Sequence, residues 1–192
     1  MTGIIILAAG SSSRLGKPKQ NLVFKGQTLL QRAIDAALNS ACRPVIVVLG
    51  SDIETIRPTI ADKPVQIVYN QEWNEGMASS IRAGVMHLQK VDPNADSVIL
   101  MLCDQPFVSD IVLNQLIQSK SEKTIVACGY NETTGVPALF DKFYFDELLV
   151  LSGQEGAKKL LLKHRDAVKT VPFDLGSIDI DTAGDFEKLA LL

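Results

Sequence analysis

Cysteine is scarce in this chain, and its scarcity excludes two kinds of architecture. The sequence contains Cys42, Cys103 and Cys128, which are widely spaced and form no C-x-x-C pair. An odd number of scattered thiols provides neither a disulfide framework nor a zinc knuckle. A reducing compartment is the simplest interpretation, so we expect a cytoplasmic protein.

Long basic runs and long apolar runs are also missing. No run of Lys or Arg exceeds the pair Lys158-Lys159, and the formal net charge is -3. The chain therefore has no basic field for a nucleic-acid backbone. The apolar run at residues 4–9 is too short to span a bilayer, and no basic region precedes it. We expect no nucleic-acid partner and no membrane association.

Within these limits, the remaining composition is that of a folded domain. Hydrophobic residues make up 46% and charged residues 21% of 192 residues, which suits one core that buries most of its apolar surface. No repeat, low-complexity tract or linker divides the chain, and the turn clusters at residues 92–94 and 131–135 are typical of short connections. We expect one domain over residues 1–192.

Strand-like and helix-like segments alternate along the chain. Short apolar runs predict buried strands at residues 4–8, 45–49, 65–69, 98–102 and 124–128. Helical spacing predicts helices at residues 28–38, 52–60, 77–88, 110–118, 143–149, 155–162 and 182–189, the last capped by Thr182. The fold class is therefore α/β. Ligands bind beyond the carboxyl ends of such strands, so the segments after Ala9, Tyr69 and Leu102 are the candidate sites.

The first strand leads into a loop of small residues followed by cations. Gly10 and Ser11 allow backbone N–H groups to approach an anion, and Arg14, Lys17 and Lys19 can neutralise a triphosphate. A flexible surface loop with solvated charges is the alternative. Five residues separate Gly10 from the next glycine and a proline follows Lys17, so this is not a Walker A loop; a serine at the middle glycine position excludes the dinucleotide fingerprint.

Carboxylates occur at two places where a metal could be held. Asp104 follows the strand at residues 98–102 and precedes a proline, which suits a ligand of Mg²⁺ beside a phosphate loop. A turn residue is the alternative. Near the end of the chain, Asp179 and Asp181 are two positions apart in an extended segment, so their side chains point the same way. Asp181 is the better candidate for the second ligand, although helix capping is an alternative role for Asp181 or Thr182.

A further helix start lies after residues 65–69. Gly76, Ser79, Ser80 and Arg82 stand at or near the first turns of the helix predicted at residues 77–88, where backbone N–H groups attract anions. They are candidates for contacts with base, ribose or phosphate. The alternative is that Trp73 packs in the core and the serines only begin the helix.

Taken together, these motifs resemble those of a known family. They are Leu7-Ala8-Ala9-Gly10 with Arg14, Gly16 and Lys19; Asn70, Trp73, Gly76, Met77, Ser79, Ser80 and Arg82; Leu102-Cys103-Asp104-Gln105-Pro106; Gly135-Val136-Pro137; and Asp179-Ile180-Asp181-Thr182. The set resembles the MobA/MocA-like nucleotidyltransferases over almost the whole chain. The combination of W-x-x-G-M-x-x-S with C-D-Q-P is most similar to the molybdenum cofactor cytidylyltransferase branch.

The resemblance implies a fold, a reaction and partners. It implies a three-layer α/β/α sandwich with a mostly parallel, mixed sheet of Rossmann-like nucleotidyltransferase type. It also implies CTP as donor, Mg²⁺ as cofactor and molybdenum cofactor as the phosphorylated acceptor, with a molybdoenzyme or cofactor chaperone as a possible recipient. Within the family, Ala9 favours CTP over GTP, because the guanylyl branch tends to have glycine there.

The expected reaction is transfer of a nucleoside monophosphate with release of pyrophosphate. Arg14, Lys19 and Asp104 are the expected catalytic residues, and Asp104 and Asp181 the expected metal ligands. The expected nucleotide-binding residues are Leu7, Ala8, Ala9, Gly10, Ser11, Arg14, Lys19, Gly76, Ser79, Ser80 and Arg82. A sugar-phosphate or alditol-phosphate nucleotidyltransferase, a glycosyltransferase and a non-catalytic nucleotide-binding regulator are the alternatives.

Overall fold

The computed structural model describes residues 1–12 and 15–189 of the chain. These residues form a seven-stranded sheet in the order β5-β4-β1-β6-β8-β7-β9 and a separate two-stranded hairpin. Strand β8 runs antiparallel to both of its neighbours, and the other pairs in the large sheet are parallel. The strands are β1 (Thr2–Ala8), β2 (Val23–Phe24), β3 (Gln27–Thr28), β4 (Val45–Leu49), β5 (Gln66–Tyr69), β6 (Ser97–Leu102), β7 (Ile125–Tyr130), β8 (Thr133–Asp141) and β9 (Val168–Pro172).

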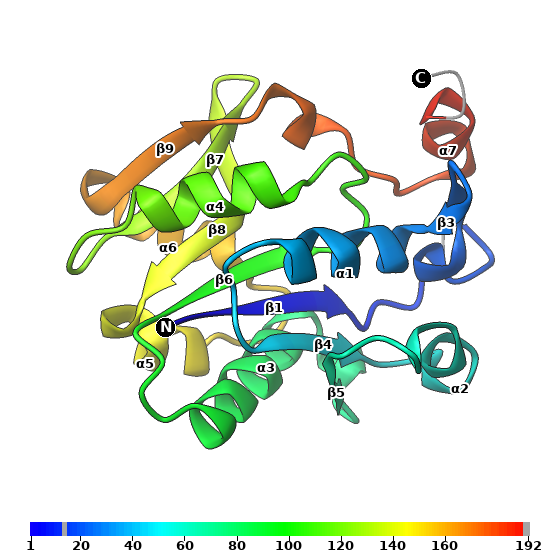
Figure 1. Cartoon of the computed structure of the whole chain (residues 1–192), viewed down its shortest axis with the longest axis horizontal. Helices are drawn as coiled ribbons and strands as arrows, with labels where there is room; N and C mark the ends of the chain where they lie inside the picture. The colour runs from blue at the N-terminus through cyan, green and yellow to red at the C-terminus, as the bar shows by residue number, and fades with distance from the viewer. Residues whose placement is uncertain (13–14, 190–192) are drawn as a thin grey trace.

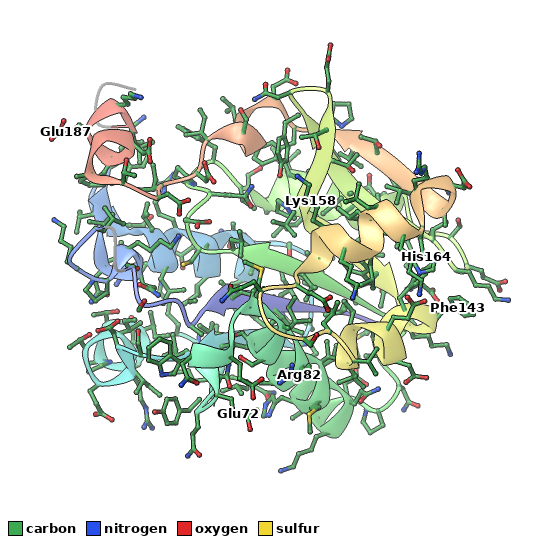
Figure 2. All side chains as sticks on the ribbon, turned by 180° about the vertical axis from the view of Figure 1, so that it is seen from behind. Glu72, Arg82, Phe143, Lys158, His164 and Glu187 are labelled. Carbon is green, nitrogen blue, oxygen red and sulfur yellow. The ribbon has the colours of Figure 1, made fainter. Side chains whose placement is uncertain are left out.

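Helices cover both faces of the large sheet. In Figure 1, α1 (Leu29–Asn39) and α4 (Asp110–Gln118) lie in front of it. From behind, Figure 2 shows α3 (Met77–Val91), α5 (Phe145–Leu149) and α6 (Ala157–Lys163) on the opposite face. The expected three-layer α/β/α sandwich with a mixed sheet is confirmed. Among the described residues, no helix has the length and apolar content needed to cross a bilayer.

The central strand, β1, is apolar without interruption from Ile4 to Ala8 because both of its faces are buried. Ile4 and Ile6 belong to the core beneath α1 and α4, whereas Ile5 and Leu7 belong to the core beneath α3. Successive side chains of a strand point to opposite faces, and both faces are covered here, so residues 4–8 are all apolar.

A third, smaller core joins two parts of the chain that are far apart in sequence. Leu22, Phe24 and Leu29, from the β2–β3 region, pack with Ile180 and Leu189. Ile180 precedes α7 (Ala183–Leu189), which Figure 1 shows beside β3. This packing carries the C-terminal segment to the carboxyl end of β1.

Two strands of the large sheet, β8 and β9, were not predicted. Residues 131–135 were expected to be a connection, but only Asn131 and Glu132 form the turn, and β8 begins at Thr133. This strand could not be predicted from the sequence because it contains Gly135 and Pro137, and both residue types are depleted in strands. Its pairing with β7 shifts register between Ala127 and Cys128, and this irregularity accommodates Pro137.

Candidate functional site

One pocket lies at the carboxyl ends of β1, β5 and β6, where the topology places ligands. Its volume is about 630 Å³. The C-terminal segment at residues 179–181 adds a further wall. Of the residues predicted to bind nucleotide, phosphate or metal, those that line it are Leu7, Ala8, Ala9, Gly10, Ser11, Lys19, Gly76, Ser80, Asp104 and Asp181.

Charge is concentrated at one end of the pocket. The Lys19 Nζ atom lies 2.6 Å from Asp104 Oδ2 and 3.1 Å from Asp181 Oδ1. Burial by itself lowers the pKa of Lys19, but the attraction of Asp104 outweighs it and the pKa is raised, so the ammonium stays charged. Asp179 also lines the pocket; partial burial, and then the charges of Asp104 and Asp181, raise its pKa.

The carboxylates at this end fit a hard divalent cation. Asp104 Oδ1 is buried and has no hydrogen-bond donor within the described part of the chain, which is a costly state for a carboxylate oxygen. The described side chains contain no cluster of three acidic, His or Cys groups that would enclose a metal by themselves. A divalent cation can be held by one or two carboxylates together with oxygens of the ligand. Asp104 and Asp181, which both contact Lys19, are the residues that could supply these carboxylates.

The thiol beside Asp104 is chemically silent. Cys103 is buried, and its burial together with the Asp104 charge raises its pKa to about 12. The thiol is therefore protonated at neutral pH and cannot act as a nucleophile. Cys103 packs in the core beneath α1 and α4.

The other end of the pocket is uncharged. Trp73, Asn74, Met77 and Gln154 line it. Gly76 adopts a φ of 121°, and a Cβ at this position would overlap the carbonyl oxygen of Gly153. The backbone there must approach closely, and the Ala78 N–H donates to the Gly153 oxygen over 3.2 Å. Glycine at residue 76 thus lets the Gly153–Gln154 segment close this end.

Two of the described residues that were predicted to bind nucleotide, Ser79 and Arg82, do not line the pocket. The Ser79 hydroxyl donates to the Gly76 oxygen and accepts from Asn70, over 2.9 and 2.8 Å. Arg82, which Figure 2 labels on α3, donates to the Leu151 oxygen over 2.8 Å and forms an ion pair with Glu75. Both side chains hold the pocket wall in place. Arg14 lies outside the described residues.

Sequence reasoning missed two glutamines that line the pocket. Gln154 lies in a segment bounded by Gly153 and Gly156, and those glycines are the only signal that its backbone is unusual. Gln20 directly follows Lys19, but nothing in its residue type indicates that its side chain is buried.

Residues 4–168 match the family model described as the MobA-like NTP transferase domain. The chain is 32% identical to nicotine blue oxidoreductase of Paenarthrobacter nicotinovorans, over 68% of this chain and 62% of that protein's length. It is 29% identical to the purine catabolism protein PucB of Bacillus subtilis, over 95% of this chain and 93% of that protein.

Solved structures give a likeness over the whole chain. The crystal structure of Rv0371c from Mycobacterium tuberculosis H37Rv superposes with a TM-score of 0.87 at 32% identity, covering 100% of this chain and 98% of that one. A structure of Rv0371c in complex with manganese gives a TM-score of 0.83 at 30% identity, covering 99% and 98%.

Proposed function

The chain belongs to the MobA-like NTP transferase family of nucleotidyltransferases, and we propose that it transfers CMP from CTP to a phosphate group of molybdenum cofactor, releasing pyrophosphate. The observation that carries this proposal is the Lys19 ammonium between Asp104 and Asp181, on the floor of a pocket where the parallel strands end. A cation that attracts phosphate and carboxylates that attract a metal are together in one place, as a metal–triphosphate complex requires.

The choice of donor rests on the first loop and on the uncharged end of the pocket. Ala9 is buried and lines the pocket. Within the family, alanine at this position favours CTP over GTP. Trp73 and Asn74 provide an apolar surface and hydrogen-bonding groups without charge, which suits a nucleobase better than a phosphate. The triphosphate then extends toward Lys19.

The reaction is an in-line displacement at phosphorus. An oxygen of the acceptor phosphate attacks the α-phosphorus, a new P–O bond forms, and the bond to the bridging oxygen breaks with both electrons leaving on pyrophosphate. A phosphate monoester is already largely deprotonated at neutral pH, so no general base is required. Neither His87 nor His164 lines the described pocket. Catalysis then comes from positioning and charge neutralisation.

Each residue has a role in that scheme. Lys19 and Arg14 stabilise the charge of the β- and γ-phosphates, and the backbone at Gly10 and Ser11 donates to phosphate oxygens. Asp104 and Asp181 would hold Mg²⁺, which supplies additional neutralisation of the triphosphate when bound. The manganese complex of Rv0371c supports the use of a divalent ion.

The remaining predicted residues shape the pocket. Gly76 and Ser80 contribute to the wall beside the base and ribose. Ser79 and Arg82 take positioning roles in this scheme, because their polar atoms bond to the protein main chain.

The test is release of pyrophosphate in the presence of Mg²⁺. CTP, GTP, ATP and UTP are offered separately, with and without molybdenum cofactor freed from a loaded protein. We expect release from CTP that depends on the cofactor. Asp104→Asn should reduce this release by about 100-fold or more, because the carboxylate charge is lost. Asp62→Asn, at an exposed position, is the matched control and should retain activity.

Other outcomes identify the alternatives. Turnover of a phosphosugar without molybdenum cofactor would assign the chain to the sugar-phosphate nucleotidyltransferases. Tight nucleotide binding without pyrophosphate release, under every acceptor offered, would indicate a regulator and overturn the proposal.

A further inference from the structure

Gln20 is a buried glutamine whose carboxamide bonds to the first loop. The residue is 1% exposed. Its Nε2 atom donates to the Ala8 oxygen over 2.8 Å and to the Gly10 oxygen over 3.1 Å. Both carbonyls belong to the segment where β1 ends and the pocket begins. The carboxamide therefore fixes the direction of two peptide groups that line the pocket.

Fixing a carbonyl also fixes the N–H group across the same peptide bond. The peptide unit is planar and trans, so its C=O and N–H point in opposite directions. The bond from Gln20 to the Gly10 oxygen thus turns the Ser11 N–H away from Gln20. If this peptide rotated, the Gly10 oxygen would take the place of the Ser11 donor. An anionic ligand would then meet a negative dipole instead of a positive one.

Side-chain packing in the described part of the chain does not restrain Gly10. A Cβ built at Gly10 would have no described heavy atom within 4 Å, and glycine itself permits a wide range of backbone angles. The hydrogen bond from Gln20 is consequently a restraint on this peptide.

The same short turn also holds Lys19. Gln20 and Lys19 are consecutive in the one-turn 3-10 helix Lys19–Asn21. The Lys19 N–H donates to the Ser12 hydroxyl over 2.9 Å, while the Lys19 ammonium reaches Asp104. The turn thus contacts the loop at Ala8, Gly10 and Ser12, and connects it to the carboxylates.

We propose that Gln20 is a positioning residue that keeps the Gly10–Ser11 peptide oriented to donate to a phosphate of the bound nucleotide. This inference rests on the proposed function, because it requires a polyphosphate ligand in the pocket. It assigns Gln20 to the phosphates rather than to the base or ribose.

The test compares a nucleotide with its nucleoside. Binding of CTP with Mg²⁺, and of cytidine, is measured by calorimetry and ligand-detected NMR for the full chain. Gln20→Met keeps the length of the side chain and removes both donors. We expect CTP affinity to fall roughly tenfold or more, because a charge-assisted hydrogen bond is lost, while cytidine affinity is unchanged. Gln20→Glu, close in shape, should give the same selective loss through repulsion of the two carbonyls.

Gln31 provides a matched control. Its carboxamide also bonds to the main chain, donating to the Thr59 oxygen over 2.9 Å, but it does not line the pocket. Gln31→Met should lower stability in urea without changing either affinity.

Each outcome decides between the two proposals. Equal losses for CTP and cytidine in the Gln20 variants, or no loss for CTP, would overturn the positioning role while leaving the proposed function intact. Failure of the wild-type chain to bind any of the four nucleoside triphosphates would instead overturn the proposed function, and this inference with it.

Discussion

Lys19 carries the positive charge that balances the acidic end of the pocket. Its ammonium is mostly buried between Asp104 and Asp181, with 18% of the side chain exposed. Removing it would break the ion pair with the buried Asp104, and would remove the phosphate contact proposed above. Lys17 is close in sequence but exposed, and its side chain does not line the pocket.

This pair of lysines supports a prediction at the level of single residues. Lys19→Met should lower kcat/KM for the nucleotide by about 100-fold or more, because the buried charge that would stabilise the departing pyrophosphate is lost. Lys17→Met should lower it roughly threefold or less, since exposed charges are screened by salt. Steady-state pyrophosphate release measures both. Equal losses in the two variants would show that the loop attracts phosphate only by its summed charge.

At the level of secondary-structure elements, the start of α3 determines how the uncharged end of the pocket closes. Gly76 precedes α3 in a backbone conformation that favours glycine, and the Gly153 carbonyl lies directly against it. Arg82, further along the helix, holds Leu151 of the same segment. The helix and the segment that carries Gln154 are thus assembled as a unit.

Gly76→Ala should lower the free energy of unfolding by more than the cost of backbone strain, because the added Cβ would also collide with the Gly153 oxygen. Gly26 also has a positive φ, of 82°, but a Cβ there would have no described atom within 4 Å. Gly26→Ala should therefore cost only about 1 kcal/mol of unfolding free energy, and Gly76→Ala about 3 kcal/mol or more. Gly76→Ala should also raise the KM for the nucleotide. Urea unfolding and kinetics of both variants test this, and equal costs would contradict the close approach to Gly153.

For the whole molecule, an ion pair outside the pocket connects distant parts of the chain. Asp96, directly before β6, lies 2.6 Å from Lys120, which follows α4, and accepts a hydrogen bond from Ser97. Partial burial alone would raise the pKa of Asp96. The hydrogen bonds from Lys120 and Ser97 outweigh it and lower the pKa to about 2 from an ordinary 3.8.

The lowered pKa predicts how stability depends on pH. Because the folded protein favours the ionised carboxylate, Asp96 stabilises it above about pH 4, and this contribution is lost as the pH falls through about 2. Asp96→Asn should therefore be less stable than wild type at pH 7, by less than about 1 kcal/mol since the group is half exposed. The difference should vanish toward pH 2. Lys120→Met should show the same trend, and a difference that is constant with pH would contradict it.

Local sequence was sufficient for much of the fold. Apolar runs predicted β1, β4, β6 and β7, because strands covered on both faces are rich in apolar residues. The strand at β5 was also predicted, but not its burial: β5 lies at the edge of the sheet, where it is half-buried and Tyr69 is exposed. Local sequence also placed Gly10 and Asp104 just after strands and Lys19 in the loop that follows β1, and the topology brought all three to one pocket. The predicted helix at residues 52–60 divides at Arg57, where Pro58 follows, into α2 (Ile53–Ile56) and a 3-10 turn.

Tertiary structure decided what depended on partners far along the chain. β8 owes its place to pairing with β6 and β7, which outweighs the unfavourable Gly135 and Pro137. Asp181 meets Lys19 across 162 positions of sequence, because apolar packing around Ile180 brings the C-terminal segment back to the hairpin. The sequence by itself determined which residue types follow each strand, since buried strands impose a local pattern. Only the folded structure decided that Gln20 bonds to the first loop and Arg82 to Leu151. The acceptors are main-chain carbonyls, which every residue has, so the sequence does not indicate which of them is used.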